Sequence, residues 1–452
     1  MKKLYSAKSN NLKPILNLVL VMVLALSPTL FTYGQVKVPF TPRSSVFTPG
    51  KTIYNVKGDF TMIGNTNLTL VNYTDDGNNA DDMKYVDVDN DPNTLNSSSA
   101  TLTFSDEFGA VPDCSNIVYA GLYWSGRAGA ENTFTVTKNV EVNNQIVPVT
   151  KTFDKRKISI KGPNATNYTE LTANPNDIYY PSGVDDNMYS AYVDVTDYVK
   201  NNGQDGVYHV ADMALVEGDG DDIGYFGGWG MVVVYENSQM KWRDITVFDG
   251  HAYIKGHATL NHTLDVVGFN STQSGPVNLR LGIMAGEGDR SIGGDYFKIQ
   301  KQSDNTYQPL RHDGNSMTNF FNSTIRTEGA RNPNLLNNTG LDITMFDLDN
   351  INNSIIGNNQ TSTRFQYGST QDSYIIFNIT FAVDAYIPES EGLLSIQSIA
   401  GNAVNAPYVA LPGDEIEYGL EIRNKGTEPI ENAKLVIPIP FTSEFVPGSI
   451  SF

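Results

Sequence analysis

The chain has 452 residues, a formal net charge of -19, and charged side chains at only 18% of its positions. Such a negative surface repels nucleic acid and anionic lipid, which excludes nucleic-acid binding. A single cysteine, Cys114, argues against a disulfide-stabilised eukaryotic ectodomain and favours a bacterial surface protein.

Residues 1–34 predict an export signal. Lys2 and Lys3 open a basic region, residues 15–26 are apolar except for Asn17, and small residues precede a cleavage point before Gln35. The apolar stretch is short for a bilayer about 30 Å thick. We therefore predict secretion to the exterior of a bacterial outer membrane, with secretion machinery as a partner and no membrane span after signal removal.

Residues 35–384 predict strands throughout and contain no convincing amphipathic helix. The strongest predicted strands are Phe60–Tyr73, Ile117–Trp124, Phe134–Val149 (a hairpin around Asn143 and Asn144), Tyr189–Val199, Met231–Tyr235, Asp244–Phe248, Leu260–Val267, Leu279–Met284 and Ser373–Val383. Frequent turn signals between them predict an all-β fold, a jelly roll or β-sandwich. One large sandwich and two sandwiches with a break near residues 212–224 both fit the pattern.

Residues 385–452 predict the start of another domain. After a polar, proline-marked linker at 387–392, apolar residues alternate from Ile416 to Ile422, and a second run begins at Ala433 beyond the turn at 424–426. An immunoglobulin-like sandwich needs about 100 residues. The segment is therefore predicted to be a truncated, partial immunoglobulin-like sandwich.

Several sequence blocks occur in a specific order: IVYAGLYWSGR at 117–127, YVDVTDYVK at 192–200, GGWGMVVVYEN at 227–237 and WRDITVFDG at 242–250. Together they resemble the amino-terminal β-sandwich region of large Bacteroidota cell-surface adhesins and gliding-motility surface proteins. The segment from Pro412 resembles the first repeat of the conserved domain of unknown function eleven. The resemblance implies a leading region of a repeat-containing surface protein, and it implies location and role more than mechanism.

Three acidic groups are candidate calcium sites, because hard cations prefer several oxygen ligands. The candidate metal ligands are Asp87, Asp89 and Asp91 in the first group, Glu217, Asp219, Asp221 and Asp222 in the second, and Glu287, Asp289 and Asp295 in the third. The first departs from the helix-loop-helix calcium pattern, since Pro92 stands where glycine is required. Solvated acidic turns are the alternative for each group.

Two classes of function follow. The first is a non-enzymatic adhesin module that binds a cell-surface or extracellular polysaccharide or protein in adhesion or gliding motility, with calcium as its candidate cofactor. Tyr168, Tyr179 and Tyr180 are its candidate ligand-binding residues, because aromatic faces cover the apolar faces of sugars; capping of the sandwich is the alternative role. The second class is a glycoside hydrolase with a carboxylate pair on the sandwich. The sequence favours the first and predicts no catalytic residues.

Overall fold

The computed structural model describes residues 36–45, 48–142, 145–386, 390–426, 430 and 433–451. Strands dominate these residues, and α2 (Thr196–Asn202) is their one α-helix. The predicted all-β class is confirmed. The predicted strand at 189–199 is divided, however, because its second half forms α2. The export signal and the turn at Asn143 and Asn144 lie outside the described residues.

The largest sheet has eleven strands in the order β11-β12-β6-β14-β2-β15-β24-β17-β22-β20, with β1 beside β15. Their bounds are β1 (Val36–Pro42), β2 (Tyr54–Thr66), β6 (Asn116–Arg127), β11 (Ile178–Tyr179), β12 (Met188–Asp194), β14 (Gly227–Glu236), β15 (Trp242–Ile254), β17 (Leu279–Gly286), β20 (Ile325–Arg326), β22 (Leu341–Asp347) and β24 (Tyr374–Asp384). β2 pairs with β14 over residues 58–66 but with β15 only over residues 54–57. This short junction divides the sheet into two halves.

Each half has a smaller sheet on its outer side. The five-stranded sheet has the order β10-β9-β13-β5-β21, and the four-stranded sheet has the order β16-β23-β18-β19. Their bounds are β5 (Ser97–Leu102), β9 (Lys157–Lys161), β10 (Thr169–Thr172), β13 (Gly206–Ala211) and β21 (Arg331–Asn332), then β16 (His262–Val267), β18 (Asp295–Gln300), β19 (Tyr307–Pro309) and β23 (Ser362–Ser369). The remaining elements are β3 (Leu68–Leu70), β4 (Met83–Tyr85), β7 (Thr133–Val142), β8 (Gln145–Asp154) and the short 3-10 turns η1 (Glu107–Gly109), η2 (Pro112–Cys114), η3 (Asp221–Ile223) and η4 (Ile351–Asn353).

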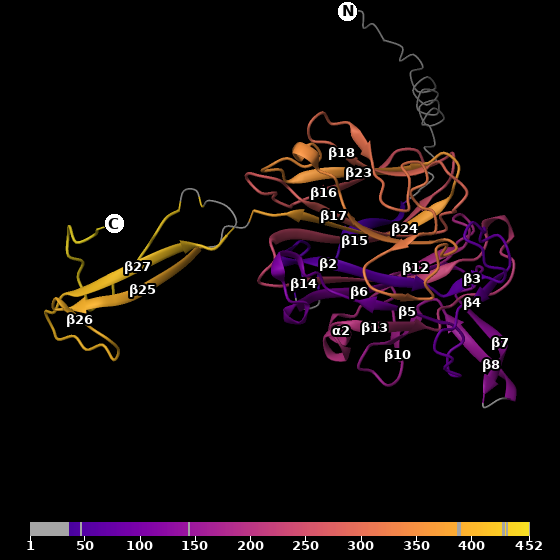
Figure 1. The fold of residues 1–452 in the computed structure, drawn as a ribbon, viewed down its shortest axis with the longest axis horizontal. Coiled ribbons are helices and arrows are strands. Elements are labelled where there is room, and N and C mark those ends of the chain that lie inside the picture. Colours follow the sequence, from indigo (N-terminus) through magenta and orange to yellow (C-terminus); the bar gives the residue numbers. More distant parts are fainter. Residues whose placement is uncertain are drawn as a thin grey trace, which may run out of the picture.

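The sheets therefore form stacked layers with three apolar cores (Figure 1). The first core, with Trp124 and Trp229, lies under the five-stranded sheet. The second, with Phe297 and Phe365, lies under the four-stranded sheet. The third joins the two halves of the large sheet, so β14 and β24 are buried on both faces. That double burial explains why MVVVY at 231–235 is continuously apolar instead of alternating.

The region therefore contains two sandwiches, and the first core ends at Met240 while the second begins at Phe248. Along the chain, the change from the first core to the second falls at the β14–β15 connection. The domain break near residues 212–224 stays a prediction. Met213 and Leu215, inside that stretch, are fully buried in the first core. Its glycines and acids resemble an inter-domain linker in composition, but these apolar residues fix it to the first sandwich.

The carboxy-terminal segment extends away from the stacked layers (Figure 1). It forms a three-stranded sheet of β25 (Ser390–Ile399), β26 (Asn402–Ala403) and β27 (Ile416–Asn424). The predicted second run, 433–439, is not in a strand, and its Leu435 and Ile437 are exposed. Part of the predicted linker, 387–389, lies outside the described residues.

Candidate functional site

The four-stranded sheet has an exposed outer face whose side chains follow from strand alternation. In β18, Phe297 and Ile299 point into the second core, so Lys298 and Gln300 point outward. In β23, Phe365 points inward, and its neighbour Arg364 lies on the outer face. The inner face is thus apolar and packs into the second core, while the outer face carries a row of polar side chains.

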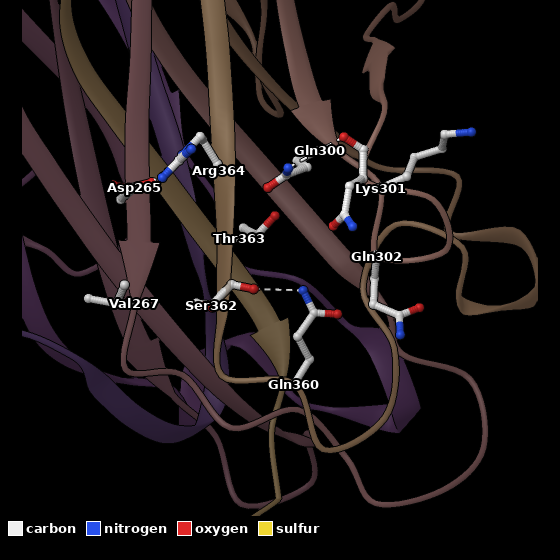
Figure 2. A pocket seen from close by; sticks show the side chains of 10 residues that line it. Asp265, Val267, Gln300, Lys301, Gln302, Gln360, Ser362, Thr363 and Arg364 are labelled. Atoms are coloured by element: carbon white, nitrogen blue, oxygen red, sulfur yellow. Dashed lines mark hydrogen bonds and ion pairs between the residues drawn. The ribbon is translucent and has the colours of Figure 1, made fainter.

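A groove of about 510 Å³ lies at one end of this face (Figure 2). It is lined by Asp265, Val267, Gln300, Lys301, Gln302, Asn305, Gln360, Ser362, Thr363 and Arg364. Arg364 pairs across strands with Asp265, and Lys301 pairs with Asp304 at 2.8 Å. The side chain of Gln360 is held in place, because its Nε2 donates to the Ser362 oxygen at 2.6 Å and its Oε1 accepts from the Gly357 N–H at 2.8 Å.

The groove can form many hydrogen bonds with a polyhydroxylated ligand. Each glutamine amide both donates and accepts, and the Arg364 guanidinium is a donor only. The Gln302 side chain lies beside Gly357, where an added Cβ would meet its amide carbon at 3.3 Å. None of the motifs identified in the sequence predicted this groove. Its residues come from three strands, β16, β18 and β23, and from two loops that are far apart in the chain.

The three candidate tyrosines do not form one surface. The Tyr168 hydroxyl donates to Asp89 Oδ2 at 2.5 Å, and its ring lies 4.5 Å from Lys161 Nζ. Tyr179 is in β11, at the edge of the large sheet, and its ring stacks on His251 at 4.0 Å. Tyr180, which follows it, is half-buried. Ligand binding by these residues stays a prediction.

The first acidic group is held by protein donors. Ser97 Oγ lies 3.0 Å from Asp87 Oδ1 and 2.7 Å from Asp89 Oδ1, and Lys161 Nζ lies 3.3 Å from Asp89 Oδ2. Burial opposes ionisation of Asp89, but the hydrogen bonds from Tyr168 and Ser97, and the Lys161 charge, outweigh it and leave the pKa of the carboxyl below its usual value. Asp91 accepts from the Asn93 N–H at 2.9 Å.

The second acidic group is spread along its loop. Glu217 Oε1 accepts from the Tyr85 N–H at 2.8 Å and from Lys138 Nζ at 2.7 Å. Asp219 accepts from the backbone N–H of Asp221 at 2.8 Å, while Asp221 and Asp222 are exposed in η3. These contacts tie the loop to β4 and β7.

The third acidic group is buried at the junction of the two sandwiches. Asp289 Oδ1 accepts from Asn78 Nδ2 of the first sandwich at 2.9 Å, and burial raises the pKa of Asp289 to about 6. Asp295 accepts from the Phe321 N–H at 2.6 Å, and burial raises its pKa also to about 6. Glu287 is 3% exposed and has a φ of 77°, a strained conformation for a residue with a Cβ.

Two further carboxyls join this junction and were not predicted. Burial raises the pKa of Asp372 to about 8, and burial raises the pKa of Asp342 to about 7 although three backbone N–H groups donate to it. Burial, then the neighbouring Asp372 and Asp289, raise the pKa of Glu287 well above its usual value. A lone acid inside an apolar strand, as in Leu341-Asp342-Ile343, was the available signal for Asp342. Protonation relieves the repulsion among these groups.

Among the described residues, no three carboxylate, histidine or cysteine side chains gather in an arrangement that could hold a metal ion. The ten candidate metal ligands lie in the three separate acidic groups described above. None of the described helices has the length and apolar character required to cross a membrane.

Comparison with known proteins gives little further information. No family model matches the chain, and no curated protein matches it. Similar solved structures include a recombinant N-glycanase F (PNGase F), at 11% identity over 72% of this chain and 96% of the other, with a TM-score of 0.19. The glycosylasparaginase PNGase F of Flavobacterium meningosepticum gives the same identity and coverage with a TM-score of 0.18. Scores of this size carry no argument about the activity of this chain.

Proposed function

We propose that this chain belongs to an exported bacterial surface protein that binds a glycan without turning it over. The groove on the outer face of the four-stranded sheet is the observation that carries this proposal. Its polar side chains stand on a sheet whose other face is packed into the second core, so the binding groups are displayed on a rigid support. Neutral sugars are recognised by groups that donate and accept hydrogen bonds together.

The sequence supports the same role independently. The export signal predicted at residues 1–34 would deliver the chain to the cell surface, and its sequence blocks resemble those of Bacteroidota adhesins and gliding-motility proteins. A formal net charge of -19 also disfavours anionic polymers as ligands and favours neutral glycans. Glycan binding without catalysis would be sufficient for a role in adhesion or gliding.

The proposal is tested with a glycan array followed by calorimetric titration of the glycans that are retained. Replacing Arg364 with Ala removes one charged donor from the groove, and we expect affinity to fall roughly tenfold or more. Arg423→Ala is the matched control, because Arg423 is also an exposed arginine paired with an acid, Glu421, but lies in the separate carboxy-terminal sheet. Equal affinity of the two variants would overturn the assignment to this groove.

One observation favours a hydrolase as a second candidate. Glu287 and Asp372 are buried acids with raised pKa values, and a protonated carboxyl is the group that a general acid requires. Both side chains are covered, with exposures of 3% and 4%, so a substrate would need the junction to open. Release of reducing sugar that disappears in Glu287→Gln but persists in Arg364→Ala would favour this candidate over binding alone.

A further inference from the structure

The three-stranded sheet of the carboxy-terminal segment has one long free edge. Its strand order is β26-β25-β27, so β25 is central and the other two strands are edges. β26 has two residues, whereas β27 has nine. In the part of the chain that the structure describes, no strand pairs with the outer side of β27. This side presents a row of backbone N–H and C=O groups to solvent, which is a template for pairing with another strand.

The chain that follows β27 does not cover this edge. Residues 433–451 are exposed throughout and include no strand. Pro438 and Pro440 also lack the N–H that a strand donates to its neighbour. The edge is therefore open to a strand from a second molecule.

One face of β27 carries the apolar side chains of this sheet. Tyr418, Leu420 and Ile422 lie on it, and β25 adds Leu394 opposite Leu420 and Ile396 opposite Tyr418. Tyr418 is 49% exposed and Ile422 is 59% exposed. A second strand paired in phase with β27 would set its own apolar side chains beside these.

The charges on the opposite face of β27 determine which register two copies of the strand can adopt. When identical strands pair antiparallel, one residue lies on the two-fold axis and sets the register. With Leu420 on the axis, Glu417 lies opposite Arg423 of the second copy, twice by symmetry, and no like charges are opposed. The two adjacent registers, with Gly419 or Glu421 on the axis, oppose Glu417 to Glu421 or Glu421 to itself. Charge complementarity therefore favours the register centred on Leu420.

Both members of this cross-strand pair are available to a second copy. Glu417 accepts from Ser398 Oγ at 2.8 Å and has no ion pair among the described residues. Arg423 Nη2 lies 2.7 Å from Glu421 Oε1 of its own strand. A guanidinium has five N–H donors, so Arg423 can keep Glu421 and also bind Glu417 of the second copy. Because these side chains are exposed, their pairing fixes the register more than it adds affinity.

We propose that β27 is a self-association edge through which two copies of this chain join antiparallel, with Leu420 on the two-fold axis. The two small sheets then form one sheet that is continuous across both copies. Backbone hydrogen bonds, the contact of Leu420 with its own copy and the contacts of Tyr418 with Ile422 supply the affinity. The pairs of Glu417 with Arg423 select the register.

The association goes beyond the proposed function and does not depend on it. A dimer carries two copies of the groove on the outer face of the four-stranded sheet (the outer groove), which raises avidity for a multivalent glycan. Binding of a short soluble glycan to one outer groove does not involve β27, because that groove lies in the second sandwich.

The first test is sedimentation equilibrium of the full chain at physiological ionic strength, from about 1 µM to about 1 mM. We expect a monomer–dimer equilibrium. Glu417→Arg opposes like charges in both symmetry-related pairs and should weaken the dimer at least tenfold. The double exchange Glu417→Arg with Arg423→Glu should restore it, and this rescue would not occur if the single change only disturbed the sheet. Glu170→Arg is the matched control, because Glu170 is an exposed acid in another edge strand, β10, and should leave the dimer unchanged.

The second test is oxidative cross-linking in a Cys114→Ala background, since Cys114 is an exposed thiol. The thiols of Leu420→Cys should lie directly opposite each other, with a Cα separation of about 4.5–5.5 Å that suits a disulfide. Those of Ile422→Cys are displaced by four residues, about 13 Å along the strands, and should not cross-link. A chain that stays monomeric at every concentration would overturn the proposal. A dimer that Glu417→Arg does not weaken, or that cross-links as well through Ile422→Cys, would also overturn it, because another surface or register would then hold it.

Discussion

The stacked sandwiches of residues 36–386 and the three-stranded sheet of residues 390–424 are built from similar strands but differ in burial. Ile379 in β24 is fully buried, whereas Ile422 in β27 is 59% exposed and Tyr418 is 49% exposed. β24 has a sheet on each side, while the described residues place no second layer over β27. Alternation thus identifies a strand, but only a facing layer makes its apolar side chains into a core.

The largest test of this contrast removes an aromatic ring from a core. Phe297 is fully buried, and its ring lies 5.1 Å from Phe365 and 5.8 Å from Tyr367. Phe297→Ala should lower the free energy of unfolding by about 3–5 kcal/mol, because it loses apolar burial and leaves a cavity. Urea denaturation followed by tryptophan fluorescence measures this. A loss below about 1 kcal/mol would contradict the assigned core.

The next effect concerns the junction between the sandwiches. Burial raises the pKa of Asp289 to about 6, so the folded state binds the proton more tightly than the unfolded state does. Its contribution to stability is complete below the ordinary pKa near 4 and is lost as pH rises through about 6. Asp289→Asn keeps the oxygen that accepts from Asn78. It should raise the free energy of unfolding above pH 6 by roughly 3 kcal/mol, because the pKa of Asp289 is raised from 3.8 to about 6 and each pKa unit is worth about 1.4 kcal/mol.

Melting curves from pH 4 to pH 8 provide the measurement. The variant should show a flatter decline of stability with rising pH than the wild-type chain. Asp222→Asn, in an exposed turn, is the control and should follow the wild-type curve. Parallel curves for Asp289→Asn and wild type would show that Asp289 does not keep its proton in the fold.

A smaller effect is expected from calcium at the first acidic group. Ser97 and Lys161 already pair with Asp89, so a bound ion would replace existing contacts. At a tenfold excess over its dissociation constant it would stabilise the fold by about 1.4 kcal/mol. Chelation should then lower the melting temperature of residues 35–384 by roughly 2 °C. Asp91→Asn should abolish the shift. Identical melting temperatures in calcium and in chelator would remove the calcium prediction.

The smallest effect is expected in the carboxy-terminal sheet. Ile422→Ala removes apolar atoms that are already largely in water, so the free energy of unfolding of the sandwiches should change by less than about 0.5 kcal/mol. The same urea series used for Phe297→Ala gives the comparison. A loss as large as that of a core residue would mean that this face is packed in solution.

The sequence alone predicted the all-β class and the main strands, since apolar continuity at 231–235 and alternation at 416–422 are local properties of the chain. Only the tertiary structure decided where the two cores divide, because the residues that Met213 and Leu215 pack against in the first core are distant in the sequence. The outer groove likewise depends on segments distant in sequence, since the Gln302 side chain lies beside Gly357. The raised pKa values of Glu287, Asp289 and Asp372 depend on burial by loops of both sandwiches. This burial cannot be predicted from any single segment of the sequence.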